Sequence, residues 1–216
     1  MTEETQTGTQ AGAGSGRGID PEAGVRDRLV DAGVELVHAE GAQALSLREI
    51  ARRAGVSHGA PRRYFPTHLD LLSAIAREGF AELADRVAAV VGEEARERAG
   101  ARTQLDALAR VHLDFARSRR GMYELMFRHD LLESGRLGLR ETSLPLFDLL
   151  GRLVARARPG ADPEPTVVAA ALWANLHGIA QLRAWGSLRL ATRTDDIEPL
   201  LRAVLDAHLG PAGGAR

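Results

Sequence analysis

The sequence predicts an all-α protein with two helical regions, on three observations. Apolar residues recur three or four positions apart along most of the chain, as they do on the buried face of a helix. No stretch of useful length alternates apolar and polar residues, so no half-buried strand is predicted. Glycine and proline, which end helices, stand between the periodic segments. The predicted architecture is an N-terminal helix-turn-helix domain of three helices, followed by a larger helical domain of about nine helices.

Composition excludes several classes of site. The 216 residues contain no cysteine, which excludes disulfides, thiolate metal sites and a cysteine nucleophile. All 28 basic residues are arginine, and the formal net charge is −1. That charge argues against a protein that coats nucleic acid with its whole surface, but it allows a local basic patch.

The N-terminal segment, residues 1–19, is predicted to be a disordered tail because it holds almost no large apolar residue. It lacks the basic start and the apolar run of a secretory signal. The Gly12–Gly16 run follows no predicted strand, so it is not read as a nucleotide-binding loop. The longest apolar stretch, Val167–Leu176, is too short to span a bilayer. A cytoplasmic protein without a membrane partner is expected.

The helix-turn-helix domain is predicted over residues 20–67. Its first helix carries a buried face from Val25 to Val37, and Gly41 ends it in the manner of a left-handed C-cap. Ser46 is a natural N-cap for a short helix from Leu47 to Ala54. With Glu49 three residues later it forms the pattern of a capping box.

The turn and the second short helix follow directly. Gly55 provides a tight turn, and Ser57 is predicted to cap a helix from His58 to Tyr64. Pro61 falls in the first turn of that helix, where its missing N–H is not needed. Phe65 is predicted to anchor the exit. Two short helices joined by a glycine-containing turn are the helix-turn-helix unit.

The larger domain is predicted over residues 68–210, with a flexible C-terminus over 211–216. A long helix from Leu69 to Val91 opens it, and later helices are marked by apolar faces. These faces lie at Leu105–Phe115, Tyr123–Phe127, Leu144–Val154, Pro165–Arg183 and Ile197–Leu209.

The helix from Pro165 to Arg183 is apolar almost all the way round, so it must be covered on every side. The same helix of a second copy is the economical cover, since its small residues allow close approach. The alternative is a helix buried within one domain.

Local charge suggests what the helix-turn-helix does. Between Ser46 and His68, five arginines stand against one glutamate, a net charge of +4, and the rest of the chain sums to −5. Phosphate contacts supply most DNA affinity and need local positive charge. A second helix that begins with small polar residues fits a major groove. Alternatively, the unit only packs and its arginines form a solvated face. The predicted DNA-contacting residues are Ser46, Arg48, Ser57, His58, Gly59, Ala60, Arg62, Arg63, Tyr64 and His68.

This segment resembles the N-terminal domain of the tetracycline-repressor (TetR) family of bacterial regulators, over roughly Val25 to Phe80. Two positions depart from the family pattern: Arg62 stands where an aromatic residue is usual, and His68 where lysine is usual. Because histidine is half-charged at about pH 6.5, a phosphate contact from His68 is expected to be weaker than one from lysine and to depend on pH. The matching residues are Ser46, Arg48, Ile50, Ala51, Ala54, Gly55, Val56, Ser57, Gly59, Ala60, Tyr64 and Phe65.

Two further segments, Gly121–Phe127 and Leu172–Gly178, are similar to one C-terminal subclass of that family, marked by a Trp-x-x-x-His-Gly motif. The resemblance implies a homodimer whose last two long helices form a four-helix bundle. It also implies a small-molecule effector, bound in each C-terminal domain, that usually releases the operator DNA.

An apolar pocket with a few polar groups is the usual design of a small-molecule site. The alternative for each methionine and phenylalanine is plain core filling. Trp173 and His177 share a helix face and lie either at the pocket or at the dimer seam. The predicted ligand-contacting residues are His112, Phe115, Met122, Met126, Phe127, Trp173 and His177.

Two rival functions are an enzyme and a DNA-binding protein without a ligand. An enzyme would use His112 with Asp114, or His129 with Asp130, but the chain has no HExxH spacing, three-ligand metal cluster, GxSxG or Walker loop. No catalytic residue, metal or cofactor is therefore predicted. A DNA-binding protein without a ligand is the second rival, and a C-terminal domain without a cavity would favour it.

Overall fold

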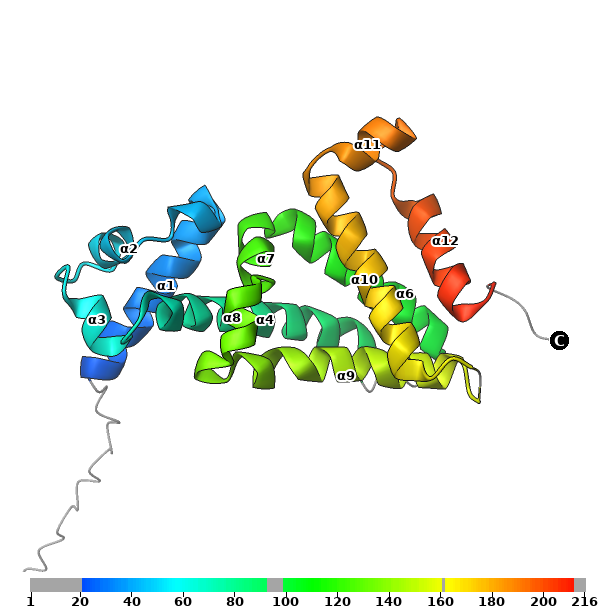
Figure 1. Cartoon of the computed structure of the whole chain (residues 1–216), viewed down its shortest axis with the longest axis horizontal. Helices are drawn as coiled ribbons and strands as arrows, with labels where there is room; N and C mark the ends of the chain where they lie inside the picture. Colours follow the sequence, from blue (N-terminus) through cyan, green and yellow to red (C-terminus); the bar gives the residue numbers. More distant parts are fainter. Residues whose placement is uncertain (1–20, 93–98, 161, 212–216) are drawn as a thin grey trace, which may run out of the picture.

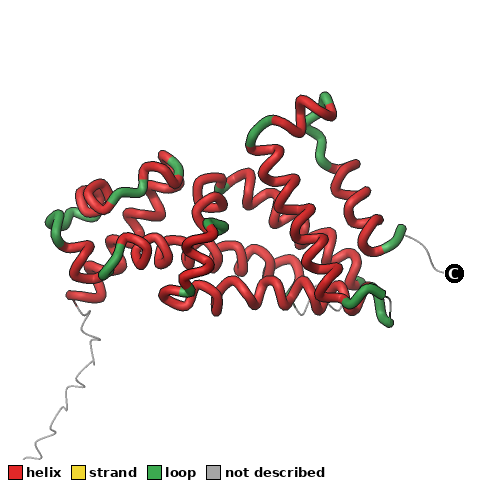
Figure 2. The backbone as a smooth tube through the Cα atoms, in the orientation of Figure 1, coloured by secondary structure: helices red, strands yellow, loops and turns green. Residues whose placement is uncertain are grey.

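The computed structural model describes residues 21–92, 99–160 and 162–211, and within these ranges it contains helices and no strand (Figure 2). The all-α fold class is thereby confirmed. The predicted tail over residues 1–19 lies outside the described residues. The helices are α1 (Pro21–Glu40), α2 (Leu47–Arg53), α3 (Ala60–Tyr64), α4 (His68–Val91), α6 (Ala101–Ser118), α7 (Arg120–Met126), α8 (His129–Ser134), α9 (Leu139–Ala157), α10 (Pro165–Ala184), α11 (Ser187–Thr192) and α12 (Glu198–Leu209), with 3-10 turns at Ala42–Ala44 and Arg136–Gly138.

The long helix α4 joins the two regions of the molecule. Helices α1, α2 and α3 gather at one end, and α4 runs from that end into the larger domain (Figure 1). There α4 packs against α6, α7 and α9, and α10 packs against α6, α9 and α12. One continuous hydrophobic core runs from Leu29 in α1 to Leu205 in α12. The two regions of the molecule therefore share one packed core rather than two separate ones.

The first helix follows the sequence prediction, with one correction at its end. Leu29, Leu36 and Val37 are buried, as the apolar spacing requires. The helix ends before Gly41, whose φ of 85° is positive as expected. Its ψ of 172°, however, is extended rather than left-handed helical. That region of the backbone map is open essentially to glycine alone, so the residue type is still explained.

Capping of α2 differs from the prediction, and a complete capping box lies instead at α4, where none was predicted. The Ser46 hydroxyl accepts a hydrogen bond from the Glu49 N–H at 3.2 Å, which is one half of the expected capping box. The Glu49 carboxylate does not return to Ser46, because it binds the guanidinium of Arg52 at 2.8 Å. The complete capping box lies at α4. There the Thr67 hydroxyl accepts from the Asp70 N–H at 3.1 Å, and the Asp70 carboxylate accepts from the Thr67 N–H at 2.9 Å.

Helix α3 is shorter than predicted. It begins at Ala60 rather than His58, and its N-cap is Gly59 rather than Ser57. The Ser57 carbonyl accepts a hydrogen bond from the Ala60 N–H at 3.0 Å, which forms a turn before the helix. Pro61 stands in the first turn, as predicted. Phe65 is buried at the exit, and the Arg26 guanidinium lies 5.1 Å from its ring centroid.

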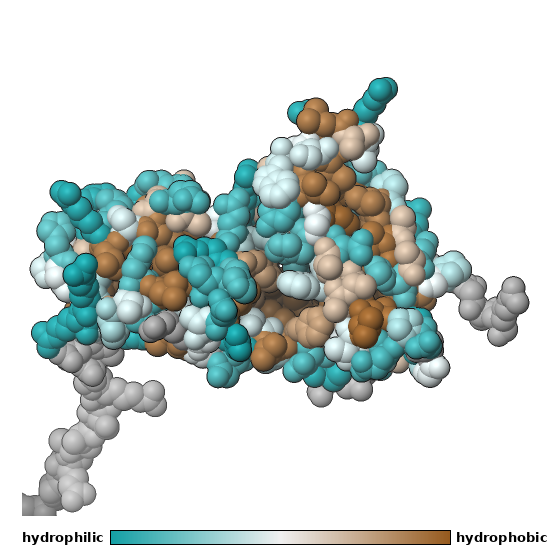
Figure 3. All heavy atoms as spheres, viewed as in Figure 1, coloured by the Kyte–Doolittle hydropathy of each residue, from teal (hydrophilic) through white to brown (hydrophobic). Residues whose placement is uncertain are grey.

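Helix α10 is only half covered by its own chain. Leu172 and Leu176 are buried against the protomer, whereas Val167 is 56% exposed and Leu182 is 41% exposed. Apolar side chains are also exposed at the end of α10 and on α11 (Figure 3), where Trp185 and Leu190 are exposed. The helix is therefore not one buried within a single domain. No helix in the described ranges is long and apolar enough to cross a membrane.

Candidate DNA-binding surface and ligand cavity

Most of the predicted DNA-contacting side chains are exposed at the helix-turn-helix end of the molecule. Ser46 and Arg48 lie at the start of α2, and Arg62 and Arg63 lie in the second half of α3. Ser57, His58 and Gly59 form the exposed turn that leads into α3, while Ala60 and Tyr64 are partly buried. Helices α2 and α3 contact one another, so these residues share one end of the fold.

The arginines of this surface are not equally available. The Glu49 carboxylate binds Arg52 at 2.8 Å and Arg53 at 3.0 Å, and these contacts lower its pKa to about 2. Arg53 also pairs with Glu40 at the end of α1. By contrast, Arg48 and Arg62 are exposed and make no ion pair with any described residue. The positive charge counted along the sequence is thus partly neutralised within the protein, whereas Arg48 and Arg62 have no acidic partner among the described residues.

Helix α3 ends in a cation–aromatic contact. The Arg63 guanidinium lies 5.9 Å from the centroid of the Tyr64 ring. Such contacts contribute about 0.5–1 kcal/mol at exposed sites, enough to bias the side chain but not to hold it rigidly.

His68 is poorly suited to serve as a charged phosphate ligand. It occupies the first position of α4, where desolvation by the surrounding protein and the nearby Arg128 guanidinium lower its pKa below 6.5. A hydrogen bond with the Leu45 backbone opposes that shift without reversing it. At neutral pH the imidazole is therefore mostly uncharged.

The larger domain contains a cavity of about 340 Å³ that opens to solvent. Its wall comes from α4, α6, α9 and α10, with Phe127 and Leu132 closing one side. In the space-filling view a hollow bordered by apolar side chains opens beside α10 (Figure 3). The described lining residues are Phe80, Leu83, Val87, Leu108, His112, Phe127, Leu132, Ser143, Leu144, Leu146, Phe147, Leu150, Ala170, Trp173 and Leu176.

The structure divides the predicted ligand residues into two groups. His112, Phe127 and Trp173 line the cavity. Phe115, Met122 and Met126 do not belong to its described lining and are fully buried in the core instead.

Local packing explains why these three side chains are directed elsewhere. The Arg86 guanidinium covers the Phe115 ring at 5.2 Å from the centroid. Met122 and Met126 occupy the space that Gly79 of α4 leaves open, since a Cβ on Gly79 would meet atoms of both at 2.6 Å. They fill a gap, which is the alternative that the sequence left open.

His177 stands behind the cavity wall in a hydrogen-bonded chain. The Tyr123 hydroxyl lies 2.9 Å from Nε2 of His112 and 2.8 Å from Nδ1 of His177, so one tyrosine links helices α6 and α10. Since a hydroxyl has one proton, it donates to one imidazole and accepts from the other. Burial lowers the pKa of both histidines, that of His112 to about 4, so both are neutral at neutral pH. Trp173 is one of the lining residues of the cavity, whereas His177 contacts Tyr123 outside the described lining.

Sequence reasoning missed Tyr123 and most of the cavity wall. Tyr123 was used only to mark a helix face, although a buried tyrosine normally finds a hydrogen-bond partner. Phe80, Leu83 and Val87 follow helical spacing on α4 and could have been found only by knowing that α4 passes under the pocket. Phe147 and Leu150 carry the same kind of signal on α9.

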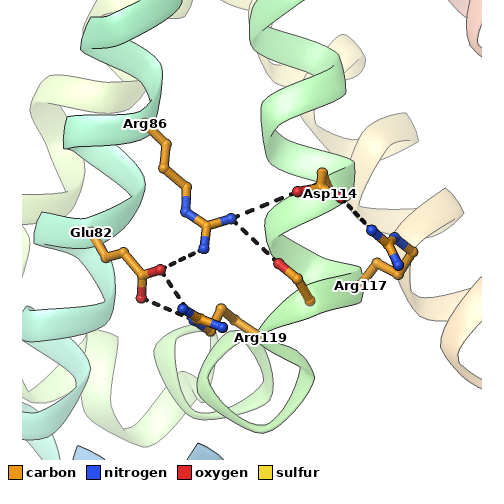
Figure 4. A network of polar contacts seen from close by, with 6 residues as sticks. Glu82, Arg86, Asp114, Arg117 and Arg119 are labelled. Atoms are coloured by element: carbon orange, nitrogen blue, oxygen red, sulfur yellow. Dashed lines mark hydrogen bonds and ion pairs between the residues drawn. The ribbon is translucent and has the colours of Figure 1, made fainter.

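A polar network outside the cavity ties α4 to the corner between α6 and α7 (Figure 4). Arg86 of α4 binds Glu82 at 2.5 Å and lies 3.7 Å from Asp114 of α6. Arg119, between α6 and α7, binds the same Glu82 at 3.1 Å. Because these side chains are roughly a third to a half exposed, each pair contributes only about 0–1 kcal/mol. The network orients the corner more than it stabilises the fold.

The described residues form no cluster of three or more histidine or acidic side chains that could hold a metal ion. Neither histidine–aspartate pair noted in the sequence gathers into such a site. His112 is bound to Tyr123, and Asp114 is bound to Arg117 at 2.7 Å. His129 lies 3.4 Å from Glu133, and Asp130 binds Arg128 at 2.6 Å.

Two family models match the chain. Residues 29–75 match the model described as bacterial regulatory proteins of the tetR family, and residues 105–208 match a tetracyclin repressor-like C-terminal domain. No protein in the curated set matches the chain.

Solved structures resemble the chain over most of its length. A protein of unknown function from Rhodococcus sp. RHA1 is 28% identical, with a TM-score of 0.70, over 86% of this chain and 93% of its own. The multidrug binding protein EbrR, solved with imidazole, is 31% identical with a TM-score of 0.56, over 91% and 94% of the two chains. A TetR-family member (SCO1917) from Streptomyces coelicolor A3 is 29% identical with a TM-score of 0.58, over 86% and 98%.

Proposed function

Since the chain belongs to the tetracycline-repressor family of bacterial regulatory proteins, we propose that it is a dimeric repressor released from its operator by a small molecule. The family is a class of transcriptional regulators rather than of enzymes. The observation that carries the proposal is that one helix serves both regions. Helix α4 begins just after the recognition helix, and its Phe80, Leu83 and Val87 line the cavity.

DNA is bound by two copies of α3 in successive major grooves of a near-palindromic operator, about one helical turn apart. Arg48 and Arg62 supply the positive charge for the phosphates, because the neighbouring Arg52 and Arg53 are paired with Glu49 and Glu40. The exposed turn of Ser57, His58 and Gly59 enters the groove first, because the small residues Ser57 and Gly59 allow close approach.

The exposed side of α10 forms the dimer contact together with α12. Along it, Ala174 is exposed, and a Cβ added to Gly178 would meet nothing within 4 Å. Small residues here let a second α10 approach closely, while Val167 and Leu182 supply apolar area at either end. Asn175 joins α10 to α12 through a 3.2 Å contact with Nε2 of His208, so the two helices present one surface.

The effect of ligand binding is transmitted to the two α3 helices through two elements. The first is α4 itself. The second is α7, which packs on α1 at Gly121 and carries Tyr123, whose hydroxyl lies 2.9 Å from Nε2 of the lining residue His112. A ligand that binds one arrangement of α4 and α7 more tightly than the other changes the separation of the two α3 helices, and only that difference in affinity drives release.

The test is a mobility-shift measurement with DNA flanking the protein's own gene, repeated across a salt series. Specific binding that weakens steeply as salt rises is expected, because phosphate contacts release counterions. Absence of binding at low salt by a folded dimer, to this DNA and to a random operator library, would overturn the proposal.

A further inference from the structure

The described cavity wall contains no charged side chain. Its lining is aliphatic and aromatic apart from two polar residues, His112 and Ser143. An ion moved from water into such a site without a partner loses hydration worth at least several kcal/mol. From this wall we propose that the effector is an uncharged, largely apolar molecule with one hydrogen-bonding group placed against His112. The inference rests on the proposed function, since it names the ligand of that same site.

Three arginines on the lining helices α4 and α9 are bound to other groups. Arg140, at the start of α9, donates to the carbonyls of Leu132 and Glu133 at 2.9 and 3.1 Å. Arg77 of α4 donates to the Leu137 carbonyl at 2.9 Å. Arg86 is held by Glu82, Ser118 and Asp114 in the network outside the cavity. To pair with one of these arginines, a carboxylate ligand would have to displace its present hydrogen bonds or ion pairs. A cationic ligand would find no acidic side chain in the described lining.

His112 is the better of the two polar anchors. The Ser143 hydroxyl lies on α9, where it donates back to the Arg140 carbonyl at 3.4 Å. The Nε2 atom of His112 is held by Tyr123, and no hydrogen bond among the described residues uses its Nδ1. Tyr123 can donate to His112 or accept from it, so Nδ1 can be a donor or an acceptor. A single neutral hydroxyl or carbonyl is the group that this nitrogen fits.

The size of the cavity limits the ligand further. About 340 Å³ stands at the small end of the range for drug-sized pockets. Leu144 of α9 is 53% exposed and Trp173 of α10 is 39% exposed, so both stand where the cavity meets solvent. A compact apolar molecule fills such a site, and a long acyl conjugate does not.

The test compares three probes of one chain length: octan-1-ol below its solubility limit, and octanoate and octylammonium below their critical micelle concentrations. Trp173 and Trp185 are the two tryptophans, and only Trp173 lines the cavity, so Trp185→Phe leaves a single fluorescent reporter at the site. Octanol is expected to bind at least tenfold more tightly than either ion. Octanol binding that is absent, or no tighter than that of an ion, overturns the inference.

A variant with one added positive charge tests whether the uncharged wall sets the preference. Leu144→Arg places one guanidinium at the exposed rim of the cavity and should raise octanoate affinity at least tenfold relative to octanol. Asp148→Asn is the matched control, because it adds the same unit of charge on the same helix at an exposed position outside the described lining. An equal gain in both variants would mean that long-range attraction, not the wall, sets the preference, and the inference fails.

Failure of the inference and failure of the proposed function are distinguishable. Probe binding is read from Trp173 without DNA, and operator binding is read without probe. If octanoate rather than octanol binds and releases the operator, the regulator stands and the ligand class is wrong. If no operator is bound, the probe series still decides what the cavity takes.

Discussion

The DNA-binding end and the cavity are built in opposite ways. The residues of the first lie within one short stretch, from Ser46 to His68, and most of them are exposed. Those of the second come from helices between Phe80 and Leu176, and they are nearly all apolar. A surface for a polyanion can be written locally because each arginine acts through its own charge. A cavity is the space that several helices fail to fill, so no single segment specifies it.

The largest expected effect is a pH dependence of stability, caused by the buried His112 in the cavity wall. The exposed DNA-binding end has no comparable buried histidine among its predicted contact residues. Unfolded His112 binds a proton near its ordinary pKa of 6.5, but burial and the neighbouring His177 lower the folded pKa to about 4. Between these values the unfolded chain binds more protons. The contribution of the neutral His112 to the free energy of unfolding is therefore fully present above pH 6.5. It is lost as the pH falls toward 4, by on the order of 3 kcal/mol.

Denaturant titrations across this pH range measure the slope, with His112→Gln as the control. The glutamine can still reach Tyr123 but does not titrate, so the variant should lose less stability on acidification. The same slope in both proteins would place the acid sensitivity elsewhere.

The second prediction concerns the joint between the two regions. A Cβ on Gly121 would lie 2.6 Å from the Val37 carbonyl oxygen and 2.9 Å from the Gly41 Cα, and both obstacles are backbone. Gly121→Ala should lower the free energy of unfolding by about 1–3 kcal/mol, as overpacking does. Gly151→Ala, where a Cβ meets nothing within 4 Å, should be neutral or stabilising by up to about 1 kcal/mol. Thermal or urea unfolding of the pair decides, and equal stability would contradict the close packing of α7 on α1.

A third prediction places the dimer contact outside both regions. Gly178→Leu fills the space above α10 and should weaken dimerisation at least tenfold, about 1.4 kcal/mol, in sedimentation measurements. Gly151→Leu adds the same side chain to α9, also into open space, and should leave the dimer unchanged. An unchanged dimer in the Gly178 variant would move the contact away from this face.

The smallest expected effect separates arginines that look equivalent in the sequence. Arg62→Ala should lower operator affinity by about fivefold to tenfold, roughly 1 kcal/mol, because Arg62 has no acidic partner among the described residues. Arg52→Ala should cost less, since Arg52 is already bound to Glu49 at 2.8 Å. Mobility shifts at fixed salt measure both. A larger loss for Arg52 would show that the ion pair opens on DNA.

By itself the sequence determined what depends on near neighbours. The Ser46 cap, the position of Pro61 in α3, the stop at Gly41 and the apolar spacing of α4 and α10 all involve contacts within a turn or two of helix. These follow from backbone hydrogen bonding and helical periodicity, which act over three or four residues. The same locality explains the family resemblance of the helix-turn-helix.

Only the tertiary structure decided which side chains meet across long separations. It brought Tyr123 next to His177, 54 residues away. It also paired Arg53 with Glu40, which lies outside the segment from Ser46 to His68 whose charge was counted. It also placed Met122 against Gly79 rather than in the cavity. The physical reason is that a buried side chain fills whatever space its neighbours leave, and that space depends on how the helices pack rather than on the spacing within any one of them.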